Sequence, residues 1–319
     1  MRSVIKPQLK ASSTVKIFTQ TKKHNKPLFE QLGIIGCGLM GSSFALAMKR
    51  AGLVKRIVGY SKSPTTTARA LQMGVIDVEA ASALQAVSGS DIILIAVPVA
   101  ATEATFKSIK HMITPQMLIM DVGSTKQDVV TSAQRVLGSS LGTFVPAHPI
   151  AGKELSGVEH ADVDLYTGRQ VILTPIGRTY TAQLLQAEDV WTALGCNVQS
   201  MSPEAHDSAF AAVSHLPHLL AFAMMNSITS QKQGADYLAL AGTGFRDFTR
   251  IAASDPKMWH DILLANRTQV LGQIAHFKQT LQAMEAMIES NDSKALESAL
   301  NSASQARGQW HLSTVKHHK

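Results

Sequence analysis

The fold is decided by the stretch Leu32-Gly33-Ile34-Ile35-Gly36-Cys37-Gly38-Leu39-Met40-Gly41. An apolar run breaks there into glycines at the spacing G-x-G-x-x-G, and the chain continues as Ser42-Ser43-Phe44-Ala45-Leu46-Ala47-Met48. The pattern predicts a buried strand, a tight turn, and a helix whose first amide groups point outward. Such amides bind a pyrophosphate, so we expect a dinucleotide site at Gly36, Gly38, Leu39, Met40 and Gly41. An ordinary tight turn between a strand and a helix is the alternative.

The residues that follow alternate between apolar runs and helical stretches. The runs are Arg56-Ile57-Val58-Gly59-Tyr60, residues 91–98, residues 116–124 and Phe144-Val145-Pro146-Ala147, with helices expected near 100–111 and 125–137. This alternation predicts a doubly wound parallel sheet, an α/β fold whose ligands bind at the carboxyl ends of the strands. Gly36, Val97-Pro98, Ser124 and His148 fall at such ends, so we expect them to share one crevice. Strands over 170–175 and 197–201, with a helix over 179–194 between them, are expected to close this domain as edge strands.

The second half of the chain has the pattern of helices alone. Ser202-Pro203-Glu204 predicts an N-cap followed by a proline in the first helical turn, and helices are expected over 203–229, 234–252, 256–288 and 292–307. We therefore expect a dinucleotide-binding domain over 30–201, a helical domain over 202–310 and a tail over 311–319. The apolar faces predict a homodimer formed through the helices, and they include Met224, Met225, Ile262, Leu263, Val270 and Ile274.

Length, charge and cysteine content limit the possible classes of protein. The chain has 319 residues, which favours two domains, and 5% aromatic residues, which favours an aliphatic helical core. Its net charge of +7 resides in residues 1–29, which hold seven basic and no acidic side chains, so the rest is balanced and nucleic acid is not expected as a partner. We interpret residues 1–29 as a disordered extension, with a transit peptide as the alternative. No membrane span is expected, and Cys37 and Cys196 have no metal-binding spacing, so we expect a cytoplasmic protein.

The end of the second predicted strand bears on the choice of cofactor. An acidic residue about 20 residues beyond the glycines accepts hydrogen bonds from the ribose of NAD. Ser61 occupies that place and Lys62 follows it. A hydroxyl beside a cation favours a 2′-phosphate, so we expect NADP rather than NAD, with NAD bound through Ser61 as the alternative.

Several motifs together resemble those of the prephenate dehydrogenases, also called cyclohexadienyl or arogenate dehydrogenases. They are the glycine turn at 36–41, Asp121-Val122-Gly123-Ser124-Thr125-Lys126, the segment 148–157 beginning His148-Pro149-Ile150-Ala151-Gly152, Ser214-His215-Leu216-Pro217-His218, and the segment 244–252 beginning Gly244-Phe245-Arg246-Asp247. The resemblance extends from about residue 31 to 288. It implies an NAD(P)-dependent oxidoreductase of tyrosine biosynthesis, which oxidises prephenate to 4-hydroxyphenylpyruvate by hydride transfer and loss of CO2.

The resemblance also implies roles for individual residues. His148 would bind the substrate hydroxyl and take its proton, and Ser124 would lie beside that hydroxyl, although a serine in this turn can simply cap a helix. Arg250, with Arg246 one turn earlier, would bind a carboxylate; the alternative is a surface pairing of Arg250 with Asp247.

Further residues are expected around the substrate. His218 would face the substrate side chain and His215 would pack beside it, while their spacing is also compatible with a metal site for which no further ligand is evident. Glu154 and Ser156 would line the mouth of the pocket. A histidine at 218 favours the keto acid of prephenate over the amino acid of arogenate, and dual specificity stays open.

Two other classes of protein fit parts of the sequence. A β-hydroxyacid dehydrogenase would share the domain order but needs a catalytic lysine in the helical domain, which is not evident. A non-catalytic dinucleotide sensor would need the glycines but neither His148 nor Arg250. No sequence feature indicates inhibition by tyrosine.

Overall fold

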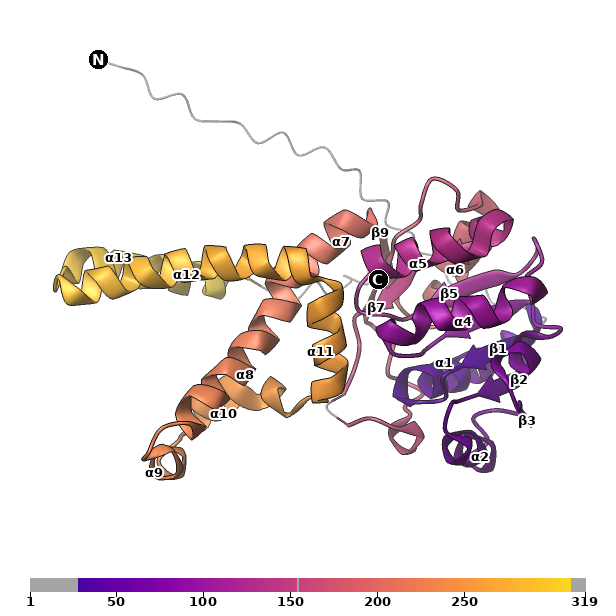
Figure 1. Cartoon of the computed structure of the whole chain (residues 1–319), viewed down its shortest axis with the longest axis horizontal. Coiled ribbons are helices and arrows are strands. Elements are labelled where there is room, and N and C mark those ends of the chain that lie inside the picture. Colours follow the sequence, from indigo (N-terminus) through magenta and orange to yellow (C-terminus); the bar gives the residue numbers. More distant parts are fainter. Residues whose placement is uncertain (1–27, 154, 311–319) are drawn as a thin grey trace, which may run out of the picture.

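The computed structural model describes residues 28–153 and 155–310. Figure 1 shows two parts, a sheet part over residues 28–200 and a helical part over residues 202–310. The predicted extension over 1–29 falls almost wholly, and the predicted tail over 311–319 entirely, outside the described residues.

The sheet part is built on six parallel strands in the order β3-β2-β1-β4-β5-β6. The strands are β1 (Phe29–Ile35), β2 (Val54–Tyr60), β3 (Val78–Glu79), β4 (Ile92–Ile95), β5 (Leu118–Asp121) and β6 (Phe144–Val145). The connecting helices are α1 (Leu39–Arg50), α2 (Pro64–Gln72), α3 (Ala83–Val87), α4 (Thr102–Ile109) and α5 (Gln127–Leu137), with short 3-10 turns over 99–101, 110–112 and 138–143. The order reverses between β1 and β4, as in dinucleotide-binding folds, which confirms the predicted doubly wound sheet.

A second sheet replaces the predicted end of the first domain. Its order is β7-β8-β9, formed by β7 (Ala147–Pro149), β8 (Gln170–Leu173) and β9 (Asn197–Ser200), with a 3-10 turn over 158–160 and α6 (Thr181–Ala193) between them. The prediction of one strand over 144–147 ending at His148 is wrong, and so is the prediction that 170–175 and 197–201 form edge strands of the parallel sheet. Pro146 has no N–H to continue the ladder, and its carbonyl accepts a hydrogen bond from Thr174 at 2.9 Å. The chain therefore leaves the parallel sheet there, and His148 pairs antiparallel with Ile172.

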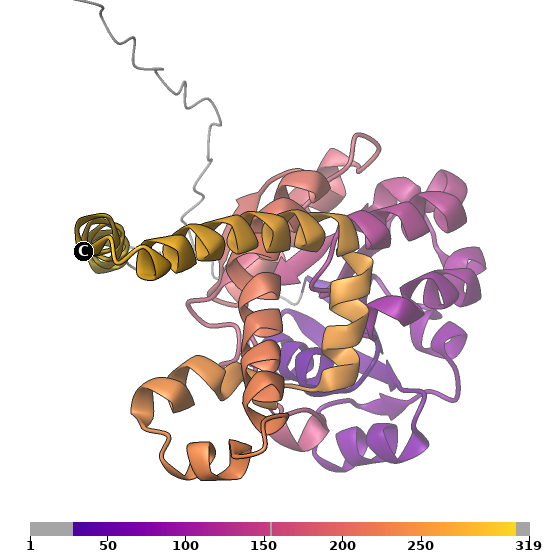
Figure 2. The same ribbon diagram turned by 60° about the vertical axis from the view of Figure 1, so that its left-hand side comes forward.

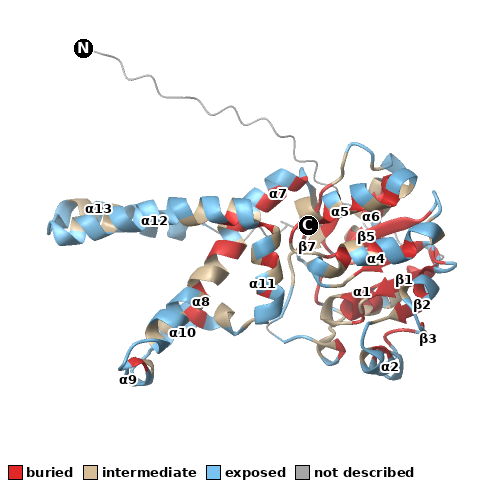
Figure 3. Ribbon diagram, viewed as in Figure 1, coloured by how far each residue is buried: buried red, intermediate tan, exposed pale blue. Residues whose placement is uncertain are grey.

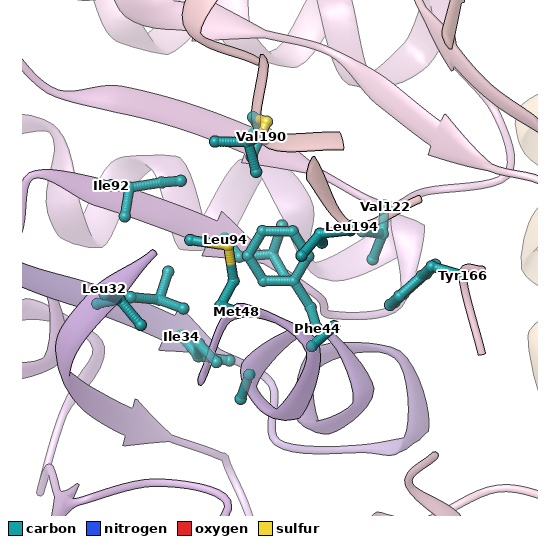
Figure 4. Packing of buried hydrophobic residues seen from close by; sticks show 14 of the residues in the cluster. Leu32, Ile34, Phe44, Met48, Ile92, Leu94, Val122, Tyr166, Val190 and Leu194 are labelled. Atoms are coloured by element: carbon teal, nitrogen blue, oxygen red, sulfur yellow. The ribbon is translucent and has the colours of Figure 1, made fainter. Parts of the chain in front are cut away.

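The main core lies between the parallel sheet, α1 and α6. Phe44, Tyr166 and Trp191 are fully buried and meet edge to face, with ring centroids 5.0 Å apart for Phe44–Trp191 and 5.3 Å for Tyr166–Trp191. Figure 4 shows Phe44 and Tyr166 among the aliphatic side chains of this cluster. The hydroxyl of Tyr166 donates to the carbonyl of Met40 at 2.7 Å, so the core also fixes the start of α1.

The helical part begins as predicted. Ser202 accepts a hydrogen bond from the Ala205 amide, and Pro203 opens the first helix. The elements are α7 (Pro203–Phe210), a π-helical turn (Ala211–His215), α8 (Leu216–Thr229), α9 (Gly234–Ala239), α10 (Thr243–Thr249), a 3-10 turn (Arg250–Ala253), α11 (Pro256–Ala265), α12 (Arg267–Glu289) and α13 (Ser293–Gln309). The prediction of helix throughout this region is confirmed.

Three of the predicted helices are interrupted. The first contains the π-helical turn just before Pro217, whose ring nitrogen cannot donate to the preceding turn. The second is divided between α9 and α10. The third is divided at Asn266, whose side chain is buried and engaged elsewhere. These interruptions redirect helix axes that apolar periodicity alone would continue.

Helices α12 and α13 form an arm that extends away from the sheet part, as Figure 2 shows. We call α12 and α13 together the helical arm. The helical run Pro203–Thr229 is long and apolar enough to cross a membrane on those two criteria, which core helices of soluble proteins also meet.

Candidate active site

The glycine turn has the shape that a pyrophosphate needs. Gly36 has φ +105°, and a Cβ there would collide with the carbonyl of Ala96. A Cβ on Gly41 would collide with the carbonyl of Gly36, whereas Gly38 faces open space. The first turn of α1, which contains Leu39 and Met40, has no side-chain cap and no acidic residue. The residues present therefore fit a dinucleotide phosphate at a helix N-terminus.

The ends of β2 and β4 flank this turn. The hydroxyl of Ser61 accepts a hydrogen bond from the Cys37 amide at 2.7 Å, which ties the end of β2 to the glycine turn, and Lys62 is exposed beside it. Val97 and Pro98 follow β4 and Ala96, the residue against which Gly36 packs. No carboxylate occupies positions 61 or 62.

His148 stands at the head of a hydrogen-bonded series of side chains. Its Nδ1 lies 2.8 Å from Nε2 of His206, and Nδ1 of His206 lies 2.7 Å from Oδ1 of Asp207. His206 and Asp207 are buried on α7, whereas His148 in β7 is partly exposed. The series therefore runs from β7 of the sheet part to α7 of the helical part.

Asp207 is held by the backbone of the sheet part. Its Oδ1 accepts from the Lys126 amide at 2.8 Å and its Oδ2 from the Gln127 amide at 2.9 Å, at the start of α5. The ammonium group of Lys126 is fully buried, pairs with Asp121 and donates to the Ala147 carbonyl at 2.8 Å. Asp121 in turn accepts from the Ala147 amide at 3.0 Å, so this ion pair fixes the residue before His148.

The ionisation of this series follows from its burial. Burial lowers the pKa of His148 well below its ordinary value, and His206 and Lys126 act in the same direction. Burial also lowers the pKa of His206, against the opposing effect of Asp207. Burial alone would raise the pKa of Asp207, but the hydrogen bonds from His206 and the two amides lower it overall. The two histidines are therefore neutral and Asp207 is charged near neutral pH.

A second group of side chains continues from this series through the helical part. The side-chain amide of Asn266 donates to the Asp207 carbonyl at 2.7 Å and lies 3.1 Å from Nδ1 of His215. The imidazole of His215 is buried, and burial lowers its pKa to about 4. The ring of Trp259 meets His215 at 6.1 Å and stacks on His218 with ring centroids 3.6 Å apart.

Arg250 lies at the far end of this group. Burial lowers the pKa of His218, the carbonyl of Ser214 opposes that effect through a 2.9 Å hydrogen bond, and the charge of Arg250 lowers the pKa further. A series of neighbouring groups, which includes the Asp207 backbone carbonyl, thus connects His148 with His218, and the charge of Arg250 acts on His218.

The other predicted residues are distributed unevenly. Ser124 is partly buried between β5 and α5, two residues before Lys126. Arg246 is largely exposed and pairs with Asp247 at 3.4 Å. Ser156 is exposed, and Glu154 lies outside the described residues.

Five residues of the site were not predicted: Lys126, His206, Asp207, Trp259 and Asn266. Lys126 belongs to the motif over 121–126, and a lysine so close to the end of a buried strand is a signal from which its role could have been predicted. The adjacent pair His206-Asp207 follows the N-cap of the first helix of the second domain, which could have indicated a polar face toward the sheet part. Trp259 and Asn266 gave no comparable signal. Among the described residues, no group of three or more His, Cys, Asp or Glu side chains could hold a metal ion.

Comparisons with known proteins converge on one family. The family model for the nucleotide-binding domain of prephenate dehydrogenase matches residues 44–200, and that for its dimerization domain matches residues 202–302. The chain is 36% identical over 266 residues to prephenate dehydrogenase of Bacillus subtilis, covering 82% of this chain and 71% of that protein. It is 32% identical over 282 residues to cyclohexadienyl dehydrogenase of Zymomonas mobilis, covering 88% and 96%.

A solved structure has the same fold over most of the chain. Prephenate dehydrogenase of Aquifex aeolicus, in complex with hydroxyphenyl propionate and NAD+, superimposes with a TM-score of 0.83 at 35% identity, covering 88% of this chain and 98% of that one.

Proposed function

The chain belongs to the prephenate dehydrogenase family, and on that premise we propose that it oxidises prephenate to 4-hydroxyphenylpyruvate and CO2 as an NAD(P)-dependent oxidoreductase of tyrosine biosynthesis. The observation that carries the proposal is His148, a partly exposed imidazole hydrogen-bonded to His206, in a sheet part whose glycine turn fits a dinucleotide. A bound nicotinamide would supply the hydride acceptor.

His148 is assigned the proton transfer. A neutral imidazole takes the proton of the ring hydroxyl while the hydride leaves the same carbon and a carbonyl forms. Loss of the ring carboxylate as CO2 then makes the ring aromatic and returns electrons to that oxygen, which takes a proton back as the phenol. His148 therefore stores one proton through the reaction, and no net proton is released. Ser124 is assigned to the same hydroxyl, because it follows the carboxyl end of β5, where ligands of such sheets bind.

The helical part is assigned to substrate binding. Arg250 binds a carboxylate of the dianionic substrate, because a guanidinium group forms two parallel hydrogen bonds with a carboxylate. We assign His218, which stacks on Trp259, to the side-chain end of the substrate. His215, Arg246, Glu154 and Ser156 complete the assignment, and the side chain of Arg246 is 73% exposed.

We assign NADP as the preferred cofactor. Ser61 and Lys62 stand where an acidic residue would repel a 2′-phosphate, and the exposed ammonium of Lys62 attracts one. The test compares kcat/KM for NADP+ and NAD+ in the wild-type protein and in Ser61→Asp. We expect the variant to shift the ratio toward NAD+ about tenfold or more, equivalent to ~1.4 kcal/mol. A wild-type protein that already prefers NAD+ strongly would contradict this assignment.

We also propose a cytoplasmic homodimer formed through the helical part. Of the apolar residues predicted for that interface, Met224 is exposed, whereas Ile262 and Val270 are buried within the chain. The large apolar side chains exposed in the helical part include Val213, Met224, Leu240, Phe248, Leu264, Leu271, Phe277, Leu281, Ile288 and Leu300. An apolar surface of this extent is typical of an interface between subunits, and the matching family model is named for dimerization. Light scattering coupled to gel filtration tests the proposal, which requires a mass near twice 34.2 kDa.

The decisive experiment is an activity assay with purified protein. Prephenate and each cofactor are mixed with the enzyme, and the absorbance of the reduced nicotinamide is followed. Rapid reduction with formation of 4-hydroxyphenylpyruvate is expected. Binding of the dinucleotide without turnover would favour the sensor alternative.

Arogenate is the second candidate substrate. The relative from Zymomonas mobilis is a cyclohexadienyl dehydrogenase, which favours testing both substrates. We assign prephenate as the main one, because no carboxylate that could pair with an amino group contacts His218 among the described residues. A higher kcat/KM with arogenate would overturn that assignment.

A further inference from the structure

We infer that His206 and Asp207 are positioning residues that hold His148 in one tautomer, with the proton on Nδ1 and the lone pair on Nε2. The inference rests on the proposed function, because it explains how His148 can accept a proton from the substrate. It states which nitrogen or oxygen donates and which accepts in each hydrogen bond of the series Asp207–His206–His148. These roles fix the tautomer of His148, which can be measured with or without turnover.

The donor and acceptor roles follow from Asp207. Each of its carboxylate oxygens accepts a backbone amide, from Lys126 at 2.8 Å and from Gln127 at 2.9 Å. These amides are donors whatever the pH, so the carboxylate is fixed in place as an acceptor. Nδ1 of His206, 2.7 Å from Oδ1, must therefore carry a proton and donate it to Asp207.

The role of Asp207 as acceptor then fixes the donor and acceptor nitrogens of both imidazoles. A neutral His206 that is protonated on Nδ1 has its lone pair on Nε2. That lone pair lies 2.8 Å from Nδ1 of His148, so His148 is the donor in this hydrogen bond. A neutral His148 that donates from Nδ1 has its lone pair on Nε2, which is the nitrogen left for the substrate hydroxyl. The opposite tautomer of His148 would present an N–H and could not take a proton.

The surroundings support neutral histidines in this series. The charged and titratable groups that act on His148 and His206 are Lys126, Asp121, Asp207 and His215. Lys126 opposes a second positive charge, and Asp207 is the single carboxylate in direct contact with either ring among the described residues. When His148 takes the substrate proton, the charge that forms is stabilised through His206 by Asp207, as in other hydrogen-bonded catalytic series.

The rings are also held sterically. His206 stacks on Phe210 with ring centroids 4.4 Å apart, and His148 packs against Phe210 at 4.8 Å. Asn266, between α11 and α12, donates to the Asp207 backbone carbonyl and holds it in place. Positions 206 and 207 can therefore be changed one at a time while their neighbours keep the backbone in place.

The first measurement is the tautomer itself. Nitrogen-15 NMR of wild-type protein, with His148 assigned through His148→Asn, should show His148 protonated on Nδ1 and unprotonated on Nε2 at neutral pH. A wild-type His148 protonated on Nε2 would overturn the inference, whatever the enzyme activity.

The second measurement uses two variants and a matched control. Asp207→Asn keeps the shape but removes the charge, and His206→Phe keeps a ring on Phe210 but removes both nitrogens. We expect kcat with prephenate to fall about 10–100-fold with KM nearly unchanged, and the Nε2-protonated form of His148 to gain population. The control Asp261→Asn alters a similar His-Asp pair on α11, where Asp261 lies 3.0 Å from the exposed His260. It should change neither kcat nor the tautomer of His148.

The outcomes separate this inference from the proposed function. Failure of the wild-type protein to oxidise prephenate would refute the function, yet the NMR experiment would still test the order of hydrogen bonds. Wild-type kcat in both variants, or a fall in kcat with an unchanged His148 tautomer, would refute the positioning role. Circular dichroism and cofactor binding identify a variant that fails to fold, in which case the wild-type spectrum decides.

Discussion

The sheet part and the helical arm differ sharply in how far they bury their apolar side chains. Leu32, Phe44 and Trp191 are fully buried, whereas Leu281 and Ile288 of the arm are 54% and 65% exposed. Figure 3 shows the contrast between the mostly buried strands and the mostly exposed α12 and α13. The sheet part completes its own core, whereas the arm has an apolar surface that a second subunit would cover. The difference indicates that the packing of the sheet part is complete within one chain, whereas the proposed dimer would cover the apolar side chains of the arm.

The largest expected effect tests whether the chemistry belongs to the sheet part. His148→Asn should lower kcat by about 10²–10⁴-fold, because an amide cannot act as a general base. Cofactor binding at the glycine turn should stay close to that of the wild-type protein. Steady-state kinetics with prephenate and fluorescence titration with NADP+ provide the measurements. A kcat near the wild-type value would remove His148 from the mechanism.

The next effect compares the two regions directly with the same substitution. Leu32→Ala in β1 should lower the free energy of unfolding by about 2–5 kcal/mol, because it leaves a cavity in a filled core. Leu281→Ala in α12 should cost less than about 1 kcal/mol, and any loss should depend on protein concentration. Urea unfolding at several protein concentrations measures both. Equal losses of unfolding free energy in the two variants, independent of protein concentration, would contradict the difference in packing between the sheet part and the arm.

Titration of His215 is expected to change the free energy of unfolding by about 3 kcal/mol between about pH 6.5 and pH 4. The pKa of His215 is about 4 in the folded protein, against about 6.5 when unfolded, so the unfolded chain binds more protons between these values. The free energy of unfolding should therefore fall as pH drops from about 6.5 to about 4, and His148 and His206 act in the same direction.

Urea unfolding across this pH range measures the effect. His215→Asn should be less stable at neutral pH but should show a shallower slope, because one titrating group is gone. A variant slope as steep as that of the wild-type protein would remove His215 as a source of the pH dependence.

The smallest effect concerns substrate binding by the helical part. Arg250→Ala should raise KM for prephenate about 10–100-fold and change kcat little, because a charged hydrogen bond is worth ~1.5–3 kcal/mol and acts before the chemical step. Arg246→Ala should raise KM less, because the carboxylate contact is assigned to Arg250 and Arg246 lies one helical turn earlier. A larger effect at 246 than at 250 would reverse the two assignments.

Local sequence patterns predicted much of this molecule. The glycine turn, the strands β1, β2, β4 and β5, and the Ser202 cap each depend on neighbouring residues, and all were predicted correctly. The second sheet was not, because the break at Pro146 depends on a partner strand more than 20 residues later. The interruption at Asn266 likewise depends on Asp207 and His215, which are distant in sequence.

The candidate site shows the same division. His148 and Arg250 could be proposed from motifs, whereas the contact of His148 with His206 joins residues 58 positions apart. A hydrogen bond of that kind depends on how β7 and α7 pack, which no local pattern encodes.

Asp207 resides on a helix of one part while its carboxylate is gripped by amides of the other. A chimera that joins the sheet part of this protein to the helices of a distant relative would therefore have to conserve more than a smooth junction at residue 202. The new helices would need a carboxylate that reaches the amides at the N-terminus of α5, as Asp207 does. Without it, the imidazole of His148 would lose its alignment even if both parts of the chimera folded.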